Sequence, residues 1–156
     1  MSIIRYYEDI FSYKIKKNKN ILIKRYNYEI EILFNNLEIV KDKNLSINTV
    51  DNNKKYDIII FENFFYSKED INKVLQKYKY TDLLMFIENV SLTYESYFKV
   101  LKEYTGFNLE YIYIGNIFDI LRHNELKTID SYRLETKNNC LLSQEVFLIT
   151  STSLWG

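Results

Sequence analysis

The sequence predicts an α/β protein with an open, mostly parallel, doubly wound sheet and helices on both faces. Two segments, residues 56–63 (YDIIIFEN) and 81–89 (TDLLMFIEN), share one order: an Asp, an unbroken apolar run, then Glu-Asn. Such a run is typical of a strand buried on both faces of a parallel sheet. The residues between the segments follow a helical pattern, which suits the helical connection between neighbouring parallel strands. We expect that helical connection to be right-handed.

The N-terminal part predicts the same alternation of helices and strands. Apolar residues recur at i, i+3, i+4 and i+7 from Ile30 to Val40, which indicates a helix. The elements expected here are a helix over 3–11, a basic connector over 14–20, a strand over 21–23, a helix over 28–41, a strand over 45–50 and a turn over 51–53.

The rest of the chain continues this order. Ser67 is expected to cap a helix, with Asp70 three residues later, and Gly106 is expected to end the next helix. The elements expected are strands over 57–62, 82–87, 109–114 and 146–150, helices over 67–78 and 94–104, one helical turn over 117–122, and irregular chain over 124–143. The last strand could run parallel or antiparallel to its neighbours.

Length and charge restrict the class of protein. The 156 residues suit one α/β domain over 1–156. With 21 basic and 21 acidic residues, no overall charge favours nucleic acid or membrane. No apolar run approaches the ~20 residues that a bilayer span needs. A single cysteine, Cys140, excludes an internal disulfide framework and suits a reducing compartment, so we expect a cytoplasmic protein.

The composition is biased toward residues with AT-rich codons, which indicates an AT-rich genome. There is no proline or alanine and there are only 3 glycines, so a glycine-rich phosphate loop is nearly excluded. The 15 tyrosines are interpreted as replacements for smaller core residues and not as evidence for base stacking.

Polar residues end the two matching segments and mark a candidate site. Glu62 and Asn63 follow one strand, Glu88 and Asn89 follow the next, and Gly115-Asn116 follow a third. The carboxyl ends of parallel strands are where open α/β sheets bind ligands. Paired carboxylates there could hold Mg²⁺ or act as acid and base. The competing interpretation is that these side chains only cap the following helices.

Other reactive side chains give weaker signals. His123 is the only histidine, which excludes a histidine metal cluster, and it is expected to lie near a helix end. No nucleophile motif surrounds any serine or threonine. Six cations and no acid lie between Lys14 and Arg25, a window that could neutralise phosphates or could be a solvated connector.

The order of elements from Tyr56 onward resembles that of class I S-adenosylmethionine-dependent methyltransferases. In this resemblance, the strand 56–60 leads into a catalytic loop over 61–66, which implies that Glu62 and Asn63 lie near the substrate. Glu88 and Asn89 are catalytic candidates through their position at the end of the next strand. The resemblance also implies S-adenosylmethionine as cofactor, with Asn27 in the turn after the first strand and Asn48 or Asp51 near the ribose. The chain departs from the family in two places. The turn 24–27 has no glycine, and one strand–helix unit between Val50 and Tyr56 is missing.

Three functions remain open on the sequence alone. The first is a methyltransferase-like Rossmann domain, either active or degenerate and serving as a partner or regulatory subunit. The second is a non-enzymatic interaction or oligomerisation module, because aromatic residues are enriched in interfaces. The third is a Mg²⁺-dependent nuclease or nucleotidyl-transfer enzyme with Glu62 and Glu88 as ligands and the basic window holding nucleic acid.

Overall fold

The computed structural model describes residues 3–24, 32, 34, 36–52, 54–65, 70–92, 112–136 and 142–152. The elements in these ranges are α1 (Ile3–Tyr13), β1 (Asn20–Lys24), α3 (Glu38–Asp42), β2 (Ser46–Asn48), β3 (Ile58–Glu62), α4 (Ile71–Tyr78), β4 (Leu83–Ser91), β5 (Ile112–Tyr113), α6 (Ile114–His123), β6 (Leu126–Thr136) and β7 (Leu142–Ser151).

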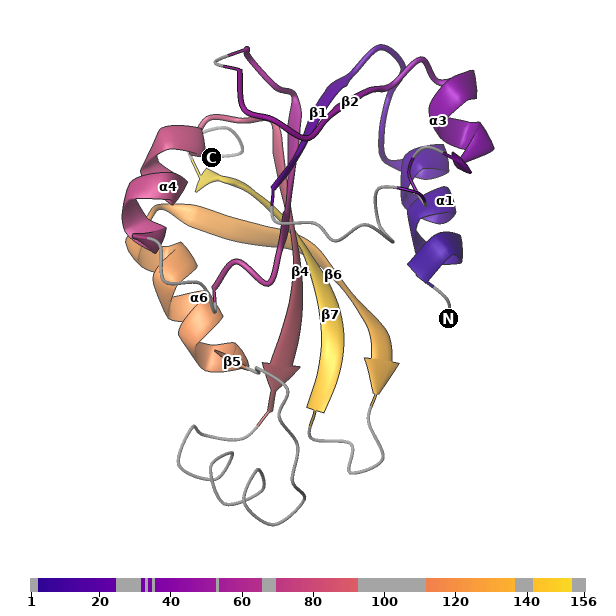
Figure 1. Ribbon diagram of the computed structural model, residues 1–156. Coiled ribbons are helices and arrows are strands. Elements are labelled where there is room, and N and C mark those ends of the chain that lie inside the picture. The colour runs from indigo at the N-terminus through magenta and orange to yellow at the C-terminus, as the bar shows by residue number, and fades with distance from the viewer. Residues whose placement is uncertain are drawn as a thin grey trace.

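One seven-stranded sheet forms the centre of the molecule, in the order β2-β1-β3-β4-β7-β6 with β5 beside β4. The strands β2, β1, β3, β4 and β5 pair in parallel, whereas β7 is antiparallel to both β4 and β6. Helices α1 and α3 lie on one side of the sheet, and α4 and α6 lie on the other (Figure 1). The predicted open, mostly parallel sheet covered on both faces is confirmed.

The two matching segments are neighbouring parallel strands, as predicted. Ile58 pairs with Leu83 at one end of β3 and β4, and Glu62 pairs with Ile87 at the other. Asp57 and Asp82 stand just before these strands. The Asp57 carboxylate accepts a hydrogen bond from the backbone N–H of Asn20 at 2.9 Å, which ties the start of β3 to the start of β1.

Alternation along the strands divides the core into two layers. Ile58 and Ile60 pack with α1 and α3, whereas Ile59 and Phe61 pack with α4 and α6. The rings of Phe61 and Phe86 stack in the second layer at 4.8 Å between centroids. Each ring is fully buried, which stabilises the fold by roughly 2 kcal/mol per side chain.

The described helices agree with the predicted ones except at their ends. Asp70 is the N-cap of α4, where its side chain accepts a hydrogen bond from the Lys73 N–H at 3.2 Å. The predicted cap Ser67, the helix over 94–104 and Gly106 lie outside the described residues. In the predicted helix over 28–41, residues 32, 34 and 36 are helical, and after a break at Leu37 α3 ends at Asp42.

Two predictions about the C-terminal half are wrong. Residues 126–136 form β6 rather than irregular chain, because β7 pairs with them along their length. Two register shifts, between Thr128 and Asp130 and between Arg133 and Glu135, break the alternation that would have revealed a strand. The strand predicted to end at residue 87 continues to Ser91, since β7 pairs with β4 that far. Gly115 and Asn116 follow β5 as predicted, and they lie there in the first turn of α6.

The link from β2 to β3 is short. Only residues 49–57 separate them, and the described part of that link contains no helix or strand. This agrees with the absence of a strand–helix unit that the sequence indicates. We call residues 49–57 the crossover. Among the described residues, no helix combines the length and apolar character that crossing a membrane requires.

Candidate functional site

Glu62 and Asn63 lie where predicted, at the carboxyl end of β3. Asn63 follows the strand with a left-handed backbone, φ 50°, and its N–H donates to the Ile87 carbonyl at 2.9 Å. Asparagine tolerates this conformation better than most residues because its short polar side chain can compensate locally. The residue type therefore has a structural reason at this position, and its exposed side-chain amide is available to a ligand as well.

Glu88 lies inside β4 and not beyond its end. Its side chain is almost completely buried, and Oε1 accepts hydrogen bonds from the N–H groups of Phe64 at 2.7 Å and Phe65 at 3.3 Å. Burial raises the pKa of the Glu88 carboxyl to about 8; the two backbone bonds act against this rise and the charge of Glu62 adds to it. Glu88 is therefore mainly protonated at neutral pH, and it fastens the turn after β3 to β4.

The two carboxyl groups leave opposite faces of the sheet. Alternation places Glu62 on the face of Ile60, which packs with α1, and Glu88 on the face of Phe86, which packs with α4 and α6. Glu62 and Glu88 therefore do not form the carboxylate pair that the sequence analysis considers for Mg²⁺ or for acid and base. The cause is the one-residue offset in register, since Glu62 pairs with Ile87 rather than with Glu88.

A buried polar group that the sequence analysis missed lies beside Glu88. Glu145 of β7 is directly opposite Glu88 in the ladder and is also buried. Its Oε1 accepts hydrogen bonds from Arg133 Nε at 3.0 Å and Ser143 Oγ at 3.3 Å, and Arg133 Nη2 lies 2.9 Å away. The sequence signal for Glu145 was an acid directly before the apolar run 146–149. Only the pairing of β7 with β4 shows that this acid lies next to Glu88. Asn89 is half-buried and lies on the other face of β4, opposite Gln144.

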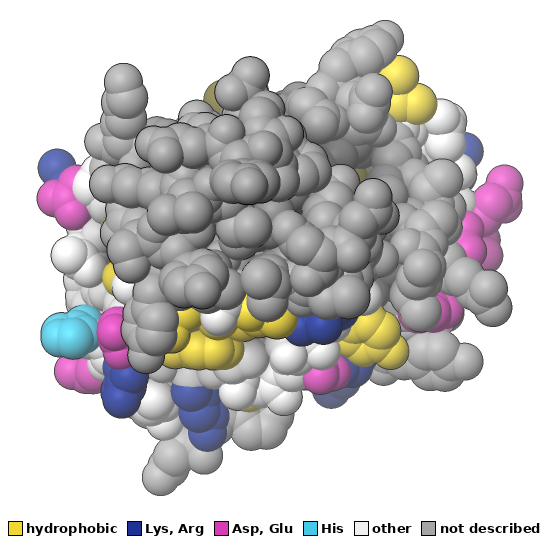
Figure 2. All heavy atoms as spheres, turned by 90° about the horizontal axis from the view of Figure 1, so that it is seen from below, with side chains coloured by type: hydrophobic (Ala, Val, Ile, Leu, Met, Phe, Trp, Pro, Cys, Tyr) yellow, Lys and Arg dark blue, Asp and Glu magenta, His cyan; other side chains and the backbone are white. Residues whose placement is uncertain are grey.

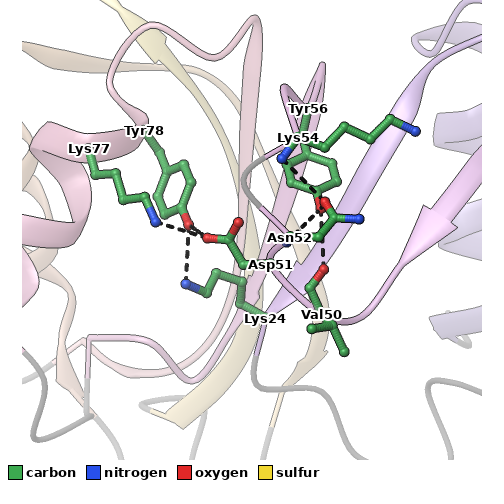
Figure 3. A network of polar contacts seen from close by, with 8 residues as sticks. All are labelled: Lys24, Val50, Asp51, Asn52, Lys54, Tyr56, Lys77 and Tyr78. Atoms are coloured by element: carbon green, nitrogen blue, oxygen red, sulfur yellow. Dashed lines mark hydrogen bonds and ion pairs between the residues drawn. The ribbon is translucent and has the colours of Figure 1, made fainter.

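The predicted cofactor residues lie in or near the crossover. Asn48, the last residue of β2, donates from Nδ2 to the Ile21 carbonyl at 3.4 Å. Asp51 forms an ion pair with Lys77 at 2.9 Å and accepts a hydrogen bond from the Tyr78 hydroxyl (Figure 3). Asn27 lies outside the described residues.

The side chain at the end of β1 also belongs to this network. Lys24 Nζ lies 3.4 Å from the Tyr78 hydroxyl and 5.0 Å from the centre of its ring. Burial, followed by the hydrogen bond to Asp51, raises the pKa of the Tyr78 hydroxyl, and the Asp51 hydrogen bond raises the pKa of Lys77. The network therefore favours a neutral Tyr78 and a charged Lys77, with Asp51 between them.

The remaining candidates are dispersed. His123 is exposed at the end of α6, as expected, with Nδ1 2.7 Å from the Asp119 carbonyl oxygen, whereas Cys140 lies outside the described residues. In the basic window, Lys14 pairs with Asp130, and Lys24 points to Tyr78. Within the described ranges, no three His, Cys, Asp or Glu side chains gather as metal ligands would.

The described side chains at the border of the face where the parallel strands end are of mixed type (Figure 2). Figure 2 views this face, and the described side chains that are visible around its border include hydrophobic, basic and acidic ones. The larger described cavity, about 480 Å³, is at the opposite end of the strands, next to Asp57 and Asp82.

Several solved methyltransferase structures are similar in fold to this chain. The chain is similar to a protein of Galdieria sulphuraria named as a sarcosine dimethylglycine methyltransferase, at 9% identity and TM-score 0.57, over 96% of this chain and 83% of that one. It is similar to magnesium protoporphyrin IX methyltransferase of Synechocystis with bound SAH, at 12% identity and TM-score 0.56, over 95% and 83%. It also matches a chain in the complex of the Haloferax volcanii Trm112 methyltransferase activator with a methyltransferase, at 8% identity and TM-score 0.51, over 91% and 88%.

These similarities concern the fold. No protein-family model matches the sequence, and neither does any curated protein. At identities near one residue in ten, shared backbone geometry is evidence of a common architecture and not of a common reaction. The chain has a methyltransferase-like Rossmann fold.

Proposed function

We propose that this chain is a methyltransferase-like Rossmann domain with a degenerate cofactor site that serves as a partner or regulatory subunit. The fold and its methyltransferase neighbours support the first part of the proposal. The second part depends on whether the residues that the resemblance assigns to S-adenosylmethionine are suited to hold it.

One observation carries the proposal: Asp51, the acid nearest the end of β2, is already bound by Lys77 and Tyr78. A ribose hydroxyl would have to replace a charged partner and a hydrogen bond at once. The end of β1 also supports a degenerate cofactor site. A ligand can approach the backbone closely there only if the residue is glycine, and this chain has Lys24. These contacts of Asp51 and Lys24 support a degenerate cofactor site.

The catalytic candidates are occupied in a similar way. The Glu88 carboxyl is buried and accepts two backbone hydrogen bonds, so its contacts are those of a structural residue. Because Glu62 leaves the other face of the sheet, the two carboxyl groups do not form a paired Mg²⁺ site. This geometry favours the degenerate domain over the nuclease hypothesis.

Calorimetric titration of the full chain with millimolar S-adenosylmethionine tests the loss of cofactor binding. We expect only heat of dilution. Saturable heat that disappears in Asp51→Asn, and persists in the control Asp42→Asn on the exposed side of α3, would show that the site is intact.

The partner role has a separate test. One structural neighbour comes from a complex of a methyltransferase with its activator, and this suggests an active methyltransferase as the partner class. We expect affinity-purified chain from its own cells to carry a methyltransferase polypeptide at a fixed ratio after cross-linking. A strict monomer in sedimentation, with no such polypeptide recovered, contradicts this role.

A further inference from the structure

A second cavity, of about 250 Å³, lies between the C-terminal end of α4 and the crossover. Three lysines and three tyrosines dominate its lining: Lys54, Lys55, Lys77, Tyr56, Tyr78 and Tyr80. No acidic side chain is among its lining residues. We call this cavity the Lys–Tyr pocket. Tyr56 and Thr81 precede β3 and β4, so the pocket lies at the opposite end of those strands from Glu62.

The crossover fixes two of the aromatic walls. The Tyr56 hydroxyl donates to the Val50 carbonyl at 3.2 Å and to Asn52 Oδ1 at 2.7 Å, and the Tyr78 hydroxyl binds Asp51 (Figure 3). Both tyrosines are buried, so their positions are set by the fold. Walls that are ordered before binding reduce the entropy lost when a ligand enters.

The third tyrosine has no role in the core. Tyr80 is 66% exposed, and Lys79 Nζ lies 5.6 Å from the centre of its ring. Lys79 itself pairs with Glu125 at 2.8 Å. A large aromatic ring left in solvent at the mouth of a basic cavity is available for stacking against a planar ligand.

Two of the pocket lysines have ammonium groups without a partner among the described residues. Lys54 and Lys55 are exposed, and their ammonium groups make no hydrogen bond or ion pair with another described residue. Lys77 is shared with Asp51, so its charge is partly neutralised. Two adjacent lysines that have no side-chain partner among the described residues, beside aromatic walls, match an anion that also carries a flat ring.

We propose that the Lys–Tyr pocket binds a nucleotide unit, with the base against Tyr80 and the phosphate at Lys54 and Lys55. Base stacking on aromatic side chains combined with basic residues along the phosphates is how proteins bind nucleotides without reading their sequence. The unit could be a free nucleotide or part of a single strand. The pocket shares Lys77 and Tyr78 with the Asp51 contacts, but the ligand contacts proposed here are those of Lys54, Lys55 and Tyr80, which do not bind Asp51.

Fluorescence anisotropy of the full chain with a labelled eight-nucleotide single-stranded RNA tests this site. Lys54→Glu combined with Lys55→Glu should weaken binding roughly tenfold or more, because two phosphate contacts become repulsive. Lys16→Glu combined with Lys17→Glu is the matched control, since it makes the same change in net charge at exposed positions of the basic window. The control should keep the wild-type affinity.

The aromatic contribution is tested with a second pair of variants. Tyr80→Ala should weaken binding about fivefold or more through lost stacking. Tyr132→Ala, on β6 and 40% exposed, is the control and should have no effect. Both residues are exposed, at 66% for Tyr80 and 40% for Tyr132, so neither truncation should unfold the protein, and circular dichroism checks this.

Competition separates the two sources of the ligand. Displacement of the RNA by adenosine monophosphate assigns the pocket to single nucleotides. No displacement, with loss of binding in both pocket variants, assigns it to a strand. The proposal is overturned if inorganic phosphate competes as well as the nucleotide, if the two double lysine variants lose affinity equally, if Tyr80→Ala binds like wild type, or if wild type does not bind.

Discussion

Glu88 of β4 lies directly opposite Glu145 of β7 in the antiparallel ladder, and both side chains are buried. Two ionised carboxylates in this arrangement would repel each other. The protein avoids the repulsion by treating the two groups differently. Arg133 neutralises Glu145 at 2.9 Å, whereas burial raises the pKa of Glu88 to about 8 and keeps it mainly protonated.

The first prediction is that stability decreases as pH rises from about 4.5 to about 8. The pKa of Glu88 is raised in the folded state from the ordinary value of 4.5, so in this window the folded protein binds the proton more tightly than the unfolded chain. Stability from this proton is complete below pH 4.5 and is lost as pH passes about 8. Glu88→Gln mimics the protonated form and should remove this slope, with a gain of a few kcal/mol at pH 8.

Urea unfolding at several pH values measures the slope. Glu38→Gln, on the exposed side of α3, serves as the control and should keep the wild-type slope. A Glu88→Gln variant that is less stable than wild type at pH 8 would show that the carboxyl is ionised in the folded protein.

The second prediction concerns the partner of Glu145. Arg133→Met should destabilise the fold by roughly 1–3 kcal/mol, because it leaves a buried carboxylate without its cation. Adding Glu145→Gln should recover much of that loss, since the uncompensated charge is then gone. Denaturant unfolding of the four proteins in this cycle measures the coupling. Additive effects of the two substitutions would contradict a direct interaction.

The third prediction separates the structural and functional roles of Asn63. Its left-handed backbone should make Asn63→Ala about 1 kcal/mol less stable, whereas Asn63→Gly should fold as well as wild type. Asn63→Gly therefore removes the side-chain amide without disturbing the turn. Thermal unfolding compares the two, with Asn116→Ala in α6 as the control for losing an exposed amide. Equal losses in the two Asn63 variants would contradict the backbone argument.

The fourth prediction tests the contacts of the crossover. Tyr78→Phe removes the hydrogen bonds to Asp51 and Lys24 and should cost about 1 kcal/mol of stability. Tyr80→Phe is the matched control, because no hydrogen bond of the Tyr80 hydroxyl to another described residue is present, and it should be neutral. The difference in free energy of unfolding between the two variants isolates the Asp51 network. No difference would mean that water satisfies Asp51 equally well.

The sheet could be predicted because its information is local. The apolar run from Ile58 to Phe61 and its copy in β4 specify strands that are buried on both faces, and a helical link between them specifies parallel pairing. The absence of a strand–helix unit before Tyr56 could also be predicted, since the nine residues between β2 and β3 are too few for a helix and a strand. Strand β6 could not be predicted, because its two register shifts break the alternation of side chains between the two faces of a strand.

The candidate site was less predictable because it depends on register. The sequence places Glu62 and Glu88 at similar points of two similar segments, but a single-residue offset sends them to opposite faces. The burial of Glu88 and its pairing with Glu145 arise from β7, which is more than fifty residues away along the chain. The Asp51 contacts likewise join residues 26 and 27 positions apart, which no local pattern encodes.

The two outermost strands of the sheet also bear on how this chain behaves at high concentration. Strand β2 offers only three residues at one border, and β6 at the other is bent by its two irregularities and carries Lys127, Asp130 and Arg133. Short, bent and charged borders discourage the addition of a foreign strand and so protect against fibril formation. In a protein so rich in tyrosine, phenylalanine and isoleucine, the edge strands β2 and β6 therefore oppose aggregation by strand pairing.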